Sequence, residues 1–156
     1  PVEKIELMKE IGHIDPITLN DVYNFKTIDE NTNCGIFGHV NTALQSELPQ
    51  QTIPVCLKQE IEIGKAQIRC NIEGSTNDYD IEILDIQMNS QEPNKSIVLQ
   101  ITDEELLELT GGIVQGMSGS PIIQDGKIIG AVTHVFVNDA TKGYGIFIEN
   151  MLDAAG

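Results

Sequence analysis

Apolar and polar residues alternate with a period of two along much of the chain. In residues 66–72 every second side chain is apolar, which is typical of a strand with one buried face. The alternation returns in residues 79–83 and then shifts by one residue at Leu84 and Ile86, as it does at a β-bulge. Further short strands are expected near residues 36–40, 53–57, 96–101, 120–124, 127–137 and 144–149.

The turns between these strands indicate how they pair. Asp125-Gly126 separates two apolar runs and predicts a tight hairpin, because both residues tolerate the backbone that such turns need. Many short strands joined by turn residues predict an antiparallel sandwich or barrel. The expected fold class is therefore all-β.

Two helices are expected to interrupt the strands. Residues 102–105, Thr-Asp-Glu-Glu, form a capping box with Thr102 as the first residue, and Gly111-Gly112 would end that helix. The second is a short C-terminal helix with one apolar face. That face would carry Ile148, Met151, Leu152 and Ala155.

Composition narrows the class of partner. The chain has 156 residues, enough for one compact domain, and its 9 basic and 24 acidic residues give a net charge of −15. Such a charge repels nucleic-acid phosphates and anionic membranes. A basic partner segment would be attracted, although an acidic surface also simply keeps a protein soluble.

The three cysteines, Cys34, Cys56 and Cys70, include no C-x-x-C pair and have no histidine at ligand spacing. This pattern excludes a zinc ribbon and does not support a disulfide framework, although one disulfide and one free thiol remain open. No apolar run approaches the ~18 residues of a membrane span, and no signal peptide is visible at Pro1. If the natural protein is exported, its targeting segment is expected to have been removed.

The segment Gly-Met-Ser-Gly-Ser-Pro, residues 116–121, is the main candidate for chemistry. It is either a surface turn or a turn that exposes a nucleophilic serine, Ser118. Gly116 permits backbone conformations closed to other residues, and Gly119 lets a substrate backbone approach. The N–H groups of Gly116 and Ser118 could then form an oxyanion hole.

The residues after the turn favour the nucleophile. Pro121 leads into an apolar strand, and the hairpin through Asp125-Gly126 returns as a second one. This order resembles the G-D-S-G-G-P segment of chymotrypsin-like serine proteases. Ser120 is the weaker candidate, since glycine normally occupies its place in that pattern.

A longer stretch carries a narrower resemblance. The run from Thr110 to Tyr144, TGGIVQGMSGSPIIQDGKIIGAVTHVFVNDATKGY, and the following residues 145–152 look like the peptidase domain of the stage IV sporulation protein B family. Residues 101–103 and 35–38 also resemble that family. The C-terminal third matches closely and the rest loosely.

The resemblance implies a chymotrypsin-like antiparallel β-barrel fold with Ser118 as catalytic serine. It implies a base in a Gly-His motif, matched by His13 or, less naturally, by His39. It places the orienting aspartate on Asp103. No metal or organic cofactor is implied.

The resemblance also implies a biological role. Members are forespore-secreted peptidases that act between the forespore and mother-cell membranes. There they cleave a regulatory subunit of an intramembrane protease complex, which then matures a late sigma factor. Residues 1–156 are expected to form a single serine peptidase domain, without the PDZ domain and the signal or membrane segments of the family.

Each partner of the serine has an alternative reading. His13 could be a histidine of a surface loop, and His39 one at a strand end. His134 alternates with Val132 on the return strand, which predicts a core or wall position close enough to line a substrate pocket.

The identity of the orienting acid also has alternatives. Asp103 could simply be an acid in the first turn of a helix, which would leave Asp80 or Asp85 as the orienting acid.

The sequence therefore predicts a serine endopeptidase with Ser118 as nucleophile, His13 as base and Asp103 as orienting acid. Its substrate would be an extended peptide paired edge-to-edge with a strand. The resemblance also implies that Gly112 falls at the base of the specificity pocket, where it would leave no charge. The rivals are a protease-like binding module that has lost its base, and an acidic adaptor with no protease ancestry.

Overall fold

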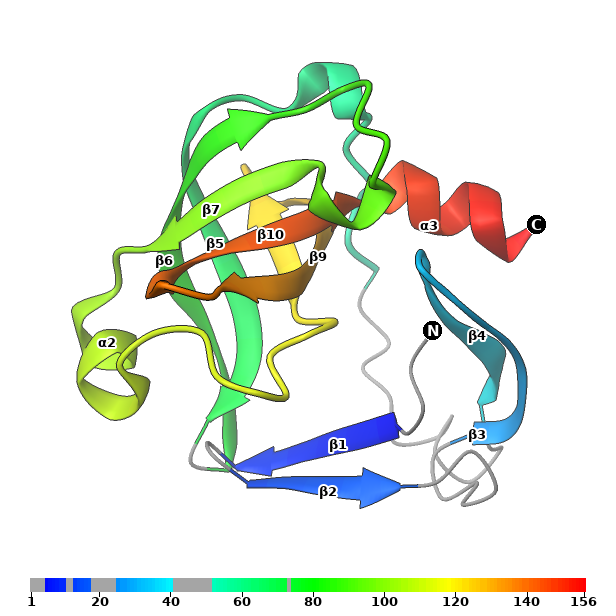
Figure 1. Cartoon of the computed structure of the whole chain (residues 1–156), viewed down its shortest axis with the longest axis horizontal. Coiled ribbons are helices and arrows are strands. Elements are labelled where there is room, and N and C mark those ends of the chain that lie inside the picture. The colour runs from blue at the N-terminus through cyan, green and yellow to red at the C-terminus, as the bar shows by residue number, and fades with distance from the viewer. Residues whose placement is uncertain (1–4, 11–12, 18–24, 41–51, 73) are drawn as a thin grey trace.

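The computed structural model describes residues 5–10, 13–17, 25–40, 52–72 and 74–156. At its centre, six antiparallel strands close into a barrel in the order β10-β7-β6-β5-β8-β9 (Figure 1). These strands are β5 (Gly64–Ile72), β6 (Ser75–Ile86), β7 (Ile97–Ile101), β8 (Pro121–Gln124), β9 (Lys127–Phe136) and β10 (Asp139–Phe147). The predicted all-β barrel is confirmed.

Two hairpins of the N-terminal part form separate two-stranded sheets. They pair β1 (Ile5–Glu10) with β2 (His13–Ile17) and β3 (Phe25–Thr32) with β4 (Gly35–Val40). In Figure 1 the first hairpin lies below the barrel and the second lies to its right, near the C-terminal helix.

The barrel core comes from the period-two pattern. In β5 the side chains of Ala66, Ile68, Cys70 and Ile72 are buried and those between them are not. Ile81 and Ile83 of β6 and Leu99 of β7 meet them inside and are at most 1% exposed. Each buried isoleucine or leucine contributes roughly 1.5–3 kcal/mol, so this core is the main source of stability.

Two local predictions about the strands are confirmed. The pairing passes from Ile83↔Leu99 to Asp85↔Val98, which leaves Leu84 as the extra residue of a bulge. Asp125 (φ 50°) and Gly126 (φ 75°) both lie in the left-handed region and join β8 to β9. That is the backbone of a type I′ hairpin turn.

Both expected helices are present, as α2 (Glu104–Thr110) and α3 (Ile148–Ala155). The predicted cap of α2 was wrong by one residue: Asp103, not Thr102, is the N-cap, and its side chain accepts the Leu106 N–H. Gly111 ends α2 in the left-handed conformation, as predicted. Two single-turn 3₁₀ helices, η1 (Lys58–Glu60) and η2 (Pro93–Lys95), lie in the connections.

Three other predictions need correction. No strand forms at residues 53–57, where Val55 makes a single bridge to Ile128. The last strand begins at Asp139, five residues before the expected start. The packed side of α3 does not include Leu152, which is 51% exposed, or Ala155. Among the described residues, no helix is long and apolar enough to cross a membrane.

Candidate active site

The serine turn lies between α2 and β8 and is held by its own backbone. The Met117 N–H donates to the Val114 carbonyl (3.2 Å), and the Ser120 N–H donates to the Met117 carbonyl (3.0 Å). Gly116 (φ 103°) and Gly119 (φ 91°) adopt backbone angles that other residues rarely reach. The Met117 side chain is fully buried, whereas Ser118 is exposed. The buried Met117 side chain therefore fixes the turn to the core, while Ser118 faces solvent.

The turn is also fastened to β9. The Gly119 N–H donates to the Val132 carbonyl (2.7 Å), and the Val132 N–H donates to the Ser120 carbonyl (3.0 Å). The Ser118 hydroxyl donates to the Thr133 carbonyl (2.9 Å). The described partner of this hydroxyl is thus a main-chain oxygen.

Two backbone donors beside Ser118 are available to a ligand. The N–H groups of Gly116 and Ser118 donate to none of the residues that the structure describes. These are the two groups that the sequence suggested for an oxyanion hole. In a catalytic serine turn, such donors stabilise the negative oxygen of the tetrahedral intermediate.

β9 has an open edge next to the turn. Its pairing with β8 ends at Ala131, whereas its pairing with β10 continues to Phe136. From Thr133 to Phe136, β9 therefore has a described strand on one side only. Val135 is 43% exposed, and Val137 just beyond the strand is 98% exposed. The open edge could pair with an extended peptide whose side chains contact these valines.

Gly112, the predicted pocket base, lies against β10. Its ideal Cβ position is 2.3 Å from the Ala140 carbonyl oxygen, so no side chain fits there. The next residue, Ile113, is 7% exposed and donates its N–H to the same oxygen (2.7 Å). Gly112 thus brings the loop before Ser118 into direct contact with β10. Its role as a pocket base stays a prediction.

The structure describes the side chain of Asp103 but not that of His13, the two predicted partners of Ser118. His13 begins β2, where it pairs with Glu10, but its side chain lies outside the described part. Asp103 accepts backbone N–H groups from Leu106 (2.9 Å) and Asp80 (3.2 Å), one on each oxygen. A carboxylate oxygen has two lone pairs, so the capping role leaves room for a further donor. The assignment of His13 and Asp103 to the serine stays a prediction.

The charge of Asp103 also acts on the core. Burial, together with the nearby carboxylates of Asp103 and Asp78, raises the pKa of the Cys70 thiol to about 11. Cys70 is therefore an un-ionised thiol at neutral pH, suited to packing and not to nucleophilic attack.

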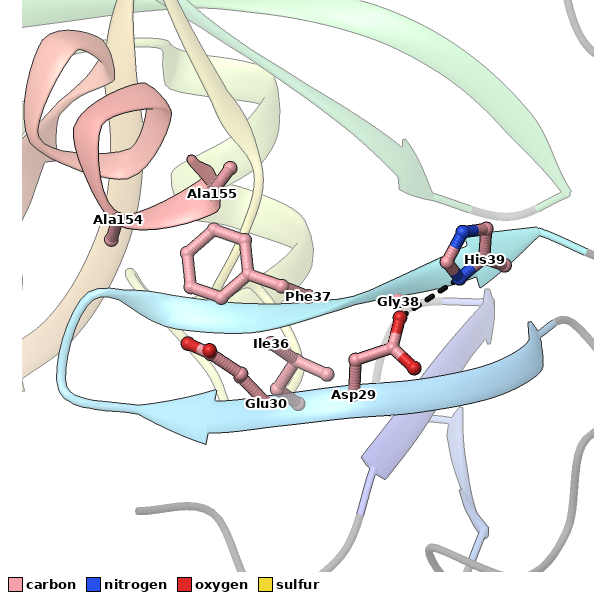
Figure 2. Close-up of a pocket in the computed structure, with 8 residues that line it drawn as sticks. All are labelled: Asp29, Glu30, Ile36, Phe37, Gly38, His39, Ala154 and Ala155. Carbon is pink, nitrogen blue, oxygen red and sulfur yellow. Dashed lines mark hydrogen bonds and ion pairs between the residues drawn. The ribbon is translucent and has the colours of Figure 1, made fainter.

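The alternative base has an acidic partner that the sequence did not reveal. His39 Nδ1 lies 2.8 Å from Asp29 Oδ2 across the β3–β4 hairpin, and Figure 2 shows the two side chains facing each other. A carboxylate on Nδ1 is the arrangement that orients a general base in a serine protease. The pair lines a cleft of about 420 Å³ between this hairpin and the end of α3. No sequence signal links residues ten positions apart in this way.

The remaining candidates are placed as follows. His134 is exposed, so the prediction of a core position was wrong. It directly follows Thr133, whose carbonyl accepts the Ser118 hydroxyl. Its place beside a substrate pocket stays a prediction. The fallback acids Asp80 and Asp85 bond to glutamine side chains. Ser120 is only 8% exposed, unlike its exposed neighbour Ser118.

Neither of two clefts in the structure includes Ser118. The first is the His39 cleft, and the second, of about 470 Å³, also borders α3 and is lined in part by Cys34, Met88 and Asp153. In the described ranges, no group of three or more His, Cys, Asp or Glu side chains could hold a metal ion.

Two solved structures with a similar fold are forms of one protease. The chain superposes on the crystal structure of the active form of Rv3671c protease from M. tuberculosis with a TM-score of 0.58 and 13% identity, covering 89% of this chain and 57% of that chain. On the inactive form of Rv3671c protease it superposes with a TM-score of 0.53 and 15% identity, covering 81% of this chain and 63% of that chain. The chain thus spans less than two thirds of either structure.

Sequence comparison gives the family. No curated protein matches the chain significantly. The family described as SpoIVB peptidase S55, however, matches residues 4–152, nearly the whole sequence. With its protease-like barrel and its exposed serine turn, the chain belongs to the SpoIVB peptidase S55 family of serine peptidases.

Proposed function

We propose that the chain is a serine endopeptidase in which Ser118 is the nucleophile. The observation that carries this proposal is the exposed Ser118 hydroxyl beside the N–H groups of Gly116 and Ser118, which donate to no described residue. The base takes the hydroxyl proton while Ser118 Oγ bonds to the scissile carbonyl carbon. The two N–H groups hold the resulting oxyanion, and its collapse expels the amine, which receives the proton from the base. Water, deprotonated by the same base, then attacks the acyl-serine ester, which releases the carboxylic acid and returns the proton to Ser118 Oγ.

The open edge of β9 would bind the substrate. A peptide that adds to this edge as an extra strand gains main-chain hydrogen bonds without regard to its sequence. The Thr133 carbonyl, next to Ser118 Oγ, is the first acceptor on this edge. Pairing here would bring one peptide bond of the added strand beside the nucleophile.

His13 is the proposed base and Asp103 its orienting acid, by the resemblance of their motifs to the family pattern. The second candidate is His39 with Asp29, which the 2.8 Å contact between their side chains supports. The two assignments make opposite predictions for single substitutions, so they can be separated directly.

The finer role is carried over from the family. The enzyme would be exported from the forespore and would act between the forespore and mother-cell membranes. Its substrate would be a regulatory subunit of an intramembrane protease complex, whose cleavage leads to activation of a late sigma factor.

One observation favours a second function, a binding module without catalysis. The Ser118 hydroxyl donates to the Thr133 carbonyl, and not to a described histidine. Such a module would keep the β9 edge for peptide binding and would leave Ser118 unreactive.

A fluorophosphonate probe separates the two functions. Its phosphorus is attacked by an activated serine oxygen, fluoride leaves, and the base takes the proton. We expect labelling of the wild-type chain at Ser118, identified by peptide mass spectrometry. Ser118→Ala should abolish it, and Ser120→Ala should retain it. The unfolding free energy of Ser118→Ala should change by less than ~1 kcal/mol, because one exposed hydrogen bond is lost. A folded wild-type chain without labelling would support the binding module.

The same assay identifies the base. We expect His13→Ala to slow labelling by at least ~10² and His39→Ala to change it little, since general-base catalysis contributes roughly 10²–10⁴. The reverse result would assign the role to His39 and Asp29. For the biological role, Ser118→Ala introduced into the endospore-forming host should block late sigma-factor maturation. Normal maturation would contradict that part of the proposal.

A further inference from the structure

Thr133 is the extra residue of a bulge in β9. Val132 pairs with Gly145 and His134 pairs with Tyr144, two adjacent residues of β10, so Thr133 is left over between them. A residue in a bulge is not fixed by the regular ladder of hydrogen bonds. The orientation of the Thr133 carbonyl, which accepts the Ser118 hydroxyl, must therefore be set by another contact.

That contact is made by the Thr133 side chain. Its hydroxyl donates to the Asn94 carbonyl of η2, in a different part of the chain. We infer that Thr133 is a positioning residue for Ser118: its hydroxyl, anchored on η2, fixes the bulge and so holds the Thr133 carbonyl against Ser118 Oγ. The inference rests on the proposed role of Ser118 as nucleophile.

η2, which accepts the Thr133 hydroxyl, is itself held in place by several contacts. The Ser96 hydroxyl donates to the Pro93 carbonyl (2.9 Å), and the Lys95 N–H donates to the Glu92 carbonyl (2.9 Å). The Lys95 ammonium lies 5.7 Å from the centre of the Tyr144 ring, within the range of a cation–π contact. Since Tyr144 pairs with His134, η2 is docked on the strand that faces the bulge.

The consequence for Ser118 is a selected rotamer. A serine side chain has three staggered positions, and the 2.9 Å bond to Thr133 favours one of them. The carbonyl positions the oxygen without activating it, because a neutral carbonyl takes no proton. In the reaction the base replaces the carbonyl as the acceptor of this proton.

Thr133→Val is the test, because valine keeps the branched shape of threonine and loses only the hydroxyl. Thr133→Ser restores the hydroxyl. Thr141→Val is the matched control, since the Thr141 hydroxyl is also part-buried and donates to Asp139 (2.6 Å), whereas none of its described hydrogen bonds reaches residues 116–121. For each variant, the maximal rate of fluorophosphonate labelling is measured at saturating probe, together with the half-saturating concentration and the melting temperature.

We expect Thr133→Val to lower the maximal labelling rate on the order of 10²-fold, the cost of misplacing a reacting group by about 1 Å. The half-saturating concentration should stay within ~3-fold, because the small probe does not use the β9 edge. Thr133→Ser and Thr141→Val should stay within ~3-fold of wild type in both quantities. A purely structural role would lower the melting temperature and the labelled fraction, but not the maximal rate per labelled site.

The inference is overturned if Thr133→Val labels at the wild-type rate, or if Thr133→Ser is as slow as Thr133→Val. If Thr133→Val does not fold, Thr133→Ala takes its place, and the same loss is expected. A wild-type chain that does not label at all would instead refute the nucleophile itself, so the two failures are distinguishable.

Discussion

Gly112→Ala should damage both the fold and the serine turn, because no room exists for a methyl group. The added Cβ would lie 2.3 Å from the Ala140 carbonyl oxygen and 2.5 Å from its carbon, where ordinary contact begins at 3.4 Å. The loop before Ser118 must therefore move away from β10 by about 1 Å. Gly112 also has a φ of 139°, which L side chains rarely adopt.

The magnitude follows from these two effects. Backbone strain of this kind costs about 1–3 kcal/mol. The hydrogen bond from the Ile113 N–H to Ala140, now 2.7 Å, would be stretched beyond its normal range, at a cost of about 1 kcal/mol. We expect a loss of roughly 2–4 kcal/mol in unfolding free energy. The displaced turn should also slow Ser118 labelling on the order of 10²-fold.

Gly111→Ala is the control for this prediction. Gly111 also has a positive φ, 72°, but no atom lies within 4 Å of its ideal Cβ. It should cost only the ~1–2 kcal/mol of a left-handed alanine and leave labelling nearly unchanged. Urea denaturation and fluorophosphonate labelling of both variants provide the test. Equal losses in the two variants would show that the contact with Ala140 has no energetic weight, and the argument from Gly112 would fail.

Two further predictions concern acids and thiols. Asp103→Asn should lower the unfolding free energy by only about 1 kcal/mol, because asparagine caps helices as well as aspartate does but its single oxygen cannot accept both the Leu106 and the Asp80 N–H. The same change should slow the reaction on the order of 10⁴-fold if Asp103 orients the base; a normal rate in a folded variant would make Asp103 a cap alone. Because burial raises the pKa of Cys70 from 9.0 to about 11, the folded state holds this proton more tightly than the unfolded state. The resulting stabilisation is present below pH 9 and should be lost as the pH rises through about 11, at a cost of about 1–2 kcal/mol. Urea midpoints of wild type and Cys70→Ala at pH 8 and 11 test this, and equal pH dependence in both would contradict it.

The strands of the barrel could be predicted from the sequence wherever buried and exposed side chains alternate along the chain. Residues 66–72 alternate because one face of β5 lies in the core, and the shift at Leu84 marks a real bulge. The start of β10 could not be predicted, since residues 139–143, Asp-Ala-Thr-Lys-Gly, show no apolar alternation. They form a strand because they pair with β7 and β9. Residues 53–57 look like a strand, but only Val55 finds a bridging partner.

The site was predictable only in its local part. The exposed Ser118 and the two backbone donors follow from a short glycine-rich segment. His134 was expected beside Val132 on the inner face, but the bulge at Thr133 turns the following residues over and exposes it. The contact between His39 and Asp29 depends on the register of the β3–β4 hairpin. The anchor of Thr133 on Asn94 joins residues 39 positions apart. Neither contact leaves a periodic signal.

The open edge of β9 also bears on how copies of the chain behave toward one another. An edge that pairs with no described strand and has exposed apolar side chains on it or just beyond it, here Val135 and Val137, is a template onto which another chain can add a strand. The net charge of −15 keeps copies apart at low ionic strength, and salt weakens that repulsion. Concentrated samples at high salt should therefore self-associate through the surface that we propose for substrate binding. Such association would appear as a loss of active sites that dilution reverses.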